Sequence, residues 1–81
     1  MRLPRDVSGV DLANKLEKYG YRITRQTGSH LRLTTLTNGD HHITIPVHKE
    51  LRIGLLSSIL SDIADHLGID REELLEGLFG K

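Results

Sequence analysis

The stretch Gln26-Thr27-Gly28-Ser29-His30-Leu31-Arg32-Leu33 (residues 26–33) joins a tight turn to the start of a predicted central strand. Its glycine permits a positive φ and its serine can hydrogen-bond its own backbone, so the turn is expected to be a rigid support. With the period-two alternation of a strand, Leu31 and Leu33 face a core. His30 and Arg32 then share the opposite, solvated face. The alternation therefore predicts an imidazole beside a guanidinium.

This pairing favours acid–base chemistry at a phosphate ester. An imidazole has an ordinary pKa of about 6.5, so it both takes and gives a proton near neutrality. The guanidinium of arginine is a planar fork with a permanent charge, which suits phosphate. The alternative interpretation is that His30 is an ordinary surface residue of a sheet. The rest of the chain has to decide between the two.

Length and composition restrict the class of protein. The chain has 81 residues, 37% hydrophobic and 27% charged, which is typical of one small folded domain. A domain of this size buries only about 60% of its unfolded surface, so a deep, enclosed active site is not expected. The absence of cysteine excludes disulfides and thiolate metal sites. No apolar run approaches the roughly 20 residues of a membrane-spanning helix, and no signal-peptide core follows the first five residues. We therefore expect a cytoplasmic protein without a membrane partner.

The formal net charge is zero, but the charges are unevenly distributed. Residues 1–60 contain nine Lys or Arg and five Asp or Glu, a net charge of +4, whereas residues 61–81 contain two and six, a net charge of −4. This asymmetry predicts a polyanion-binding surface on the body of the protein and a solvated or partner-binding acidic segment after it. The alternative is that the last helix simply has a solvent-exposed acidic face.

The segments on both sides of the opening stretch alternate between helical and strand patterns. Ser8 with Asp11, and Asp70 with Glu73, read as capping-box-like helix starts, and Asn38-Gly39 is a strong hairpin signal. We expect, in order, a helix at 9–19 ended by Gly20, strands at 21–26, 30–36 and 41–46, a core helix at 54–66 ended by Gly68, and a short amphipathic helix through Leu74, Leu75 and Leu78. The apolar stripe of the core helix is predicted to comprise Leu51, Leu55, Leu56, Ile59, Leu60, Ile63 and Leu67.

This order predicts an α+β fold with a three-stranded antiparallel sheet and both long helices on one face. The covered face is expected to carry apolar side chains, namely Ile23, Leu31, Leu33, Ile43 and Ile45. The other face stays open and is basic and hydroxylic. Its predicted members are Arg22, Thr24, His30, Arg32, Thr34, His42 and Thr44. Alternation along the strand at 21–26 places Gln26 on the same side as Arg22 and Thr24.

Four runs of sequence, in order, carry a resemblance to a known family. They are Leu16-Glu17-Lys18-Tyr19-Gly20-Tyr21, Arg25-Gln26-Thr27-Gly28-Ser29-His30, Ile45-Pro46-Val47-His48-Lys49-Glu50-Leu51 and Gly54-Leu55-Leu56-Ser57-Ser58-Ile59-Leu60. Over residues 8–68 the chain resembles the HicA (YcfA-like) toxins, and its element order resembles the double-stranded-RNA-binding fold. The chain departs from the family pattern in its neutral charge and in its longer acidic segment after Gly68. We expect one HicA-like domain over 1–81, with a core at about 8–68 and a short acidic C-terminal helix at 69–81.

The resemblance implies a toxin of a type II toxin–antitoxin system, an endoribonuclease that cleaves messenger RNA and is neutralised by a HicB antitoxin bound over it. It also implies that the histidine of the Gly-Ser-His turn, His30, is catalytic. As a hypothesis, His30 takes the proton of a ribose 2′-hydroxyl, which attacks the adjacent phosphate, so neither a metal nor a cofactor is needed. The predicted RNA-binding residues are Arg22, Gly28, Ser29, Arg32, His42, His48 and Lys49.

Three alternatives remain open at this point. A metal site is conceivable because four of the five histidines lie between residues 30 and 48, but adjacent His41 and His42 in one strand should point to opposite faces. His66, near a helix C-terminus, is expected to interact with the helix dipole instead. A second alternative is a non-catalytic RNA-binding module of the same fold. The third is a structural subunit whose apolar surface and acidic tail bind a partner.

Overall fold

The structure is a computed structural model, and it describes residues 2–80. Its elements, in order, are helix α1 (Gly9–Lys15), the 3₁₀ helix η1 (Leu16–Tyr19), strands β1 (Arg22–Thr27), β2 (His30–Thr35) and β3 (His41–Pro46), and helices α2 (Ile53–Leu67) and α3 (Arg71–Phe79). The predicted bounds of 1–81 and 69–81 include Met1 and Lys81, which lie outside the described residues.

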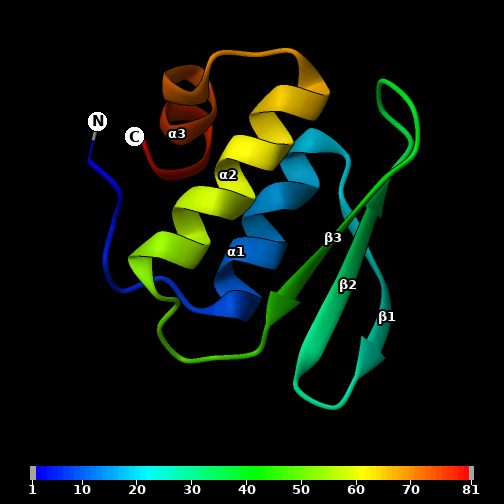
Figure 1. Cartoon of the computed structure of the whole chain (residues 1–81), viewed down its shortest axis with the longest axis vertical. Helices are drawn as coiled ribbons and strands as arrows, with labels where there is room; N and C mark the ends of the chain where they lie inside the picture. Colours follow the sequence, from blue (N-terminus) through cyan, green and yellow to red (C-terminus); the bar gives the residue numbers. More distant parts are fainter. Residues whose placement is uncertain (1, 81) are drawn as a thin grey trace.

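The three strands form one antiparallel sheet in the order β1-β2-β3. All the helices lie on one side of this sheet, and β1 is the strand furthest from them (Figure 1). The predicted fold class, an α+β sheet of the double-stranded-RNA-binding type with one open face, is therefore confirmed. The open face is the surface opposite to α1 and α2.

Local signals set the ends of the helices as predicted. The Ser8 hydroxyl accepts a hydrogen bond from the Asp11 amide at 3.0 Å, which caps α1. Gly20 ends the first helical segment and Gly68 ends α2, each with a positive φ that glycine adopts without strain. The predicted helix at 9–19 is confirmed, with its last turn tightened into a 3₁₀ helix. Asp70 caps α3 by accepting from the Glu72 amide at 3.2 Å.

One apolar core joins the sheet to the helices. Its fully buried members include Leu12, Leu16, Tyr21, Leu33, Ile45, Leu51, Leu56, Leu60, Ile63 and Leu74. Gly9 is also constrained, because a Cβ there would lie 1.9 Å from the Pro46 carbonyl oxygen. This close approach seats α1 against the end of β3.

The prediction that Ile23 and Leu55 lie in the core is wrong. Ile23 is 45% exposed, because β1 is the edge strand and the helices do not extend over it (Figure 1). Leu55 is 38% exposed, because the buried stripe of α2 runs through Leu56, Ile59 and Leu60 and leaves Leu55 on its flank.

Candidate active site

A two-residue turn places His30 at the end of the sheet. Thr27 pairs with His30 across the turn, which leaves Gly28 and Ser29 as its central residues. Gly28 has a φ of 57°, which glycine adopts without strain. A Cβ at this position would meet nothing within 4 Å, so glycine is favoured by the backbone conformation and not by a lack of space. The Ser29 carbonyl accepts a hydrogen bond from the Val47 amide at 2.6 Å, which ties the turn to the chain after β3. The side chain of His30 is exposed.

A β-bulge interrupts β1 next to this turn. Ile23 pairs with Leu33 and Arg25 pairs with Arg32, so Thr24 is an extra residue that has no partner of its own. The Thr24 hydroxyl donates to the carbonyl oxygen of Arg32 at 3.3 Å, which helps to hold the bulge against β2. Beyond the bulge, the alternation of β1 is inverted relative to an uninterrupted strand.

The inversion corrects the predicted composition of the open face. Gln26 pairs with Leu31 and belongs to the covered side of the sheet, so its predicted place on the open face is wrong. Arg25 pairs with Arg32, and Thr27 pairs with His30, so these two residues of β1 lie on the open face. The sequence does not predict either residue there: strict alternation from Tyr21 assigns Arg25 to the other side, and the predicted strand ends at Gln26, before Thr27.

The open face thus consists of three cross-strand rows. We name them the His30 row (Thr27, His30 and Pro46), the Arg32 row (Arg25, Arg32 and Thr44) and the Thr34 row (Arg22, Thr34 and His42). A shallow depression of about 320 Å³ lies over the first two rows and is lined by Arg25, Thr27, His30, Arg32 and Thr44. Within residues 2–80, neither arginine of the Arg32 row forms an ion pair with a carboxylate. The histidine and the two guanidinium groups therefore share one open, positively charged hollow.

The structure does not bring Arg22 and His42 to His30. Both lie in the Thr34 row, four residues along β2 from His30, which corresponds to about 13 Å at about 3.3 Å per residue. His42 Nδ1 instead hydrogen-bonds the Thr34 hydroxyl at 2.8 Å, and this hydroxyl also contacts that of Thr24 at 2.9 Å. His42 does not approach His30, because the register of β3 opposes His42 to Thr34.

The other predicted contact residues lie at the His30 end of the sheet but outside the hollow. Ser29 is exposed in the turn, and His48 and Lys49 are exposed in the segment between β3 and α2. The His48 carbonyl accepts a hydrogen bond from the Gly9 amide at 2.9 Å, so the backbone here is fixed to the start of α1. Neither side chain lines the depression around His30.

His41 and His66 belong to a separate polar network on the covered side. His41 Nδ1 hydrogen-bonds the Tyr21 hydroxyl at 2.7 Å, His41 Nε2 contacts Asp62 Oδ1 at 3.3 Å, and the ring stacks on His66 at 4.3 Å. Burial, together with the nearby charge of Asp62, raises the pKa of Tyr21 to about 12. His41 therefore faces α2 while His42 faces the open side, as expected for adjacent residues of a strand.

His66 has a more specific role than the predicted interaction with the helix dipole. Its Nε2 lies 2.9 Å from the Thr37 carbonyl oxygen and 3.0 Å from that of Gly39, so it donates to the loop between β2 and β3. The Asn38 side chain donates back to the His66 carbonyl at 2.8 Å. Among the described residues, no group of three or more His, Asp or Glu side chains is arranged to hold a metal ion.

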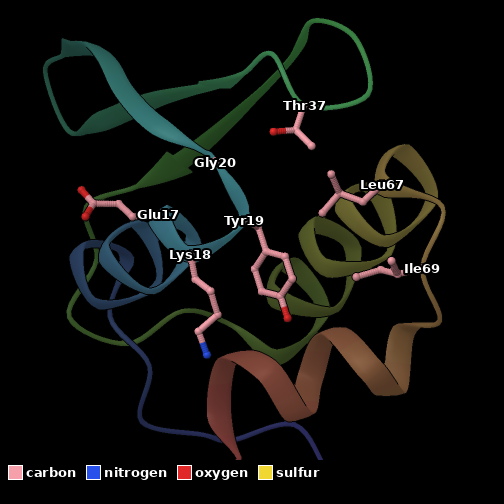
Figure 2. A pocket seen from close by; sticks show the side chains of 7 residues that line it. All are labelled: Glu17, Lys18, Tyr19, Gly20, Thr37, Leu67 and Ile69. Atoms are coloured by element: carbon pink, nitrogen blue, oxygen red, sulfur yellow. The ribbon is translucent and has the colours of Figure 1, made fainter.

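A second hollow, of about 480 Å³, lies on the side of the helices. Figure 2 shows the side chains of Lys18 and Tyr19 extending from η1 toward α3, with Leu67 and Ile69 at the end of α2. Lys18 Nζ donates to the Gly77 carbonyl at 2.5 Å, so its ammonium joins η1 to α3. No histidine lines this hollow, whereas His30 lines the depression on the open face, which is therefore the candidate active site.

Comparison with known proteins identifies the family. A sequence model of the family described as "HicA toxin of bacterial toxin-antitoxin" matches residues 9–64, more than half of the chain and the whole of the sheet. The chain belongs to the HicA toxin family. The matched HicA region includes the Gly28-Ser29-His30 turn and both arginines of the Arg32 row.

This HicA-family chain is also similar to longer proteins. Two proteins named LexA repressor, from Geobacter sp. (strain M21) and from Citrifermentans bemidjiense (strain ATCC BAA-1014 / DSM 16622 / JCM 12645 / Bem), are each 42% identical to it over 62 residues. The aligned part covers 76% of this chain, and the chain spans 30% of the length of each relative. No solved structure matches the chain. None of the helices formed by residues 2–80 has the length and apolar character needed to cross a membrane.

Proposed function

We propose that this HicA-family chain is the toxin of a type II toxin–antitoxin system and that it cleaves messenger RNA without a metal ion, with His30 as the catalytic residue. The observation that carries the proposal is the position of His30. It belongs to the family-matched region, and its exposed side chain lines a hollow on the side of the sheet that no helix covers. A polynucleotide can reach it there.

The reaction uses a nucleophile that RNA itself provides. His30 takes the proton of a ribose 2′-hydroxyl, the 2′-oxygen attacks the adjacent phosphorus, and the bond from phosphorus to the 5′-oxygen breaks. The products are a 2′,3′-cyclic phosphate and a 5′-hydroxyl whose proton comes from solvent. Proton transfer by one positioned imidazole contributes roughly 10²- to 10⁴-fold to the rate.

Positive charge beside His30 supports this chemistry. Negative charge develops on the phosphate oxygens during the attack, and the positive charge of a nearby guanidinium stabilises it electrostatically. Arg32 lies one row from His30 in the same hollow and is the predicted arginine that the structure brings to it. Arg22, His42, Ser29, His48 and Lys49 lie further out, where they would contact the RNA backbone on either side.

Cleavage of RNA in a chelator tests the proposal directly. Purified protein incubated with RNA and EDTA is expected to cleave it, and His30→Ala is expected to lose roughly 10²- to 10⁴-fold of the rate while retaining its RNA affinity and its melting temperature. Asn14→Ala, at an exposed position of α1, is the matched control and should cleave like the wild type. Retention of cleavage by a folded His30→Ala protein would refute the assignment.

The proposed partner is a HicB-type antitoxin that covers the open face. Arg22 and Arg32 are exposed on this face, and neither is paired with a carboxylate within residues 2–80. An acidic groove on the antitoxin is the simplest complement to them, because opposite potentials across an interface favour association.

A non-catalytic RNA-binding module is the second candidate function. The exposed basic rows favour it, because backbone binding by arginine needs no chemistry at His30. In that case wild type and His30→Ala would bind RNA similarly, and neither would cleave it. The same incubation in EDTA therefore separates the two candidates.

A further inference from the structure

The Arg25–Arg32 pair is not explained by the stability of the fold. The two arginines are directly opposed across β1 and β2, and both are exposed. Like charges opposed in an antiparallel pair destabilise a sheet. Within residues 2–80, neither guanidinium has a carboxylate partner. Two cations that repel each other on an open face indicate an anion that is bound between them in the functional state.

The bulge at Thr24 is the device that creates this pair. Without the bulge, in a regular strand that still includes Thr24, Arg25 would point to the same side of β1 as Ile23 does, away from the open face. With it, both arginines line the hollow that also contains His30. Bulges next to functional sites commonly re-aim a side chain in this way.

Spacing along the sheet identifies the phosphate that the pair would bind. Neighbouring rows on one face of a strand are two residues apart, which corresponds to about 7 Å. This separates the Arg32 row from the His30 row by approximately the distance between successive phosphates of an extended polynucleotide strand. A strand with its scissile phosphate at His30 would therefore present its next phosphate to the two guanidinium groups.

We propose that Arg25 and Arg32 form a subsite for the phosphodiester next to the one cleaved at His30, an inference that rests on the proposed RNA cleavage. The subsite binds one phosphate between two planar forks, a geometry that arginine provides and lysine does not. A substrate with two phosphates should therefore be cleaved with a higher kcat/KM than a substrate with one. Because both contacts are to the backbone, the preference does not depend on base sequence.

Three short substrates test this inference. Each has ribose only at the cleaved position and deoxyribose elsewhere: a dinucleotide with one phosphate, and two trinucleotides that add a second phosphate on the 5′ or the 3′ side. Wild type is expected to cleave one of the trinucleotides with a kcat/KM roughly 10- to 100-fold above that of the dinucleotide. Arg25→Ala is expected to remove this advantage and to change dinucleotide cleavage little.

Matched variants keep the test specific. Arg25→Lys should recover part of the advantage, and Arg52→Ala, an exposed arginine at the start of α2, should keep all of it. Arg25→Ala should melt at the same temperature as the wild type or higher, because it removes a repulsion. Equal cleavage of all three substrates by the wild type, or an equal loss on all three in Arg25→Ala, would overturn the inference.

Binding separates this inference from the proposed function. Fully deoxy versions of the three oligonucleotides lack the nucleophile but keep their phosphates, and their dissociation constants can be measured by titration of wild type and Arg25→Ala. A trinucleotide should bind more tightly than the dinucleotide only when Arg25 is present. If no ribose-containing strand is cleaved but this difference is found, the cleavage proposal fails and the phosphate site stands. If the difference is not found, the phosphate site is refuted.

Discussion

Deletion of Thr24 should leave the open face intact, although removal of one residue from a strand ordinarily inverts everything beyond it. The reason is the bulge: Ile23 already pairs with Leu33, and Arg25 with Arg32, so the deletion merely closes the gap between two pairs that are in register. The shortened β1 would become a regular strand. Arg25 would still oppose Arg32 on the open face.

The structure sets the expected cost of this deletion. The deletion removes two solvent-exposed hydrogen bonds of the Thr24 hydroxyl, one to the Arg32 carbonyl at 3.3 Å and one to the Thr34 hydroxyl at 2.9 Å. Because each of the two hydrogen bonds contributes about 0.5–1.5 kcal/mol, the free energy of unfolding should fall by about 1–3 kcal/mol. Urea denaturation measures this change. Affinity for a deoxy-trinucleotide should remain within a few-fold of that of the wild type.

Deletion of Gln26 is the matched control. Gln26 lies in the regular part of β1 and pairs with Leu31, so its loss forces either Arg25 or Thr27 to the opposite face. This deletion should therefore weaken oligonucleotide binding much more than the deletion of Thr24 does. If the protein without Thr24 is folded but binds as poorly as the protein without Gln26, then the bulge does not position Arg25 as the structure describes.

Two further predictions concern pH and salt. The pKa of Tyr21 is raised from 10.0 to about 12, so between these values the unfolded chain loses a proton that the folded chain keeps, and stability should fall as pH rises through this window. Tyr21→Phe should flatten this decline in thermal melts. The complex with the antitoxin should weaken between 0.1 M and 1 M salt, where the screening length falls from about 10 Å to about 3 Å, and affinity that is indifferent to salt would argue against an acidic groove facing Arg22 and Arg32.

The element order and the position of His30 could be predicted from local patterns. Period-two apolar residues in 30–36 and 41–46, and the three- and four-residue spacing in 54–66, correspond closely to β2, β3 and α2. In these segments one face is buried, so the positions of the apolar residues indicate directly which side faces the core. Both hairpin turns contain a glycine with positive φ, the strongest local signal in the chain.

The first strand could not be predicted in the same way, because it is an exposed edge. Thr24, Arg25, Gln26 and Thr27 include no apolar residue, so nothing in this run indicates which side faces the core. The bulge arises from the pairing of β1 with β2, so it cannot be predicted from the sequence of β1 alone. For this reason the sequence does not identify Arg25 as a site residue, and strict alternation places Gln26 on the wrong face.

The separation of the histidines also depends on the register between strands. His42 alternates outward as predicted, but which residue it opposes follows from the length of the turn around Asn38 and Gly39. His41 and His66, 25 residues apart in sequence, stack only because α2 crosses the covered face of the sheet. Contacts of this kind are properties of the assembled fold rather than of any one segment.

The chemical nature of the RNA ends tests the central claim most directly. If the exposed imidazole of His30 activates a ribose 2′-hydroxyl, cleavage must leave a 2′,3′-cyclic phosphate on one fragment and a 5′-hydroxyl on the other. Mass spectrometry of a short RNA cleaved in EDTA distinguishes these ends. The account predicts both of them, and a single 2′-deoxy substitution at the cleaved position should abolish the reaction. Fragments with a 5′-phosphate, or cleavage of the substituted strand, would contradict it.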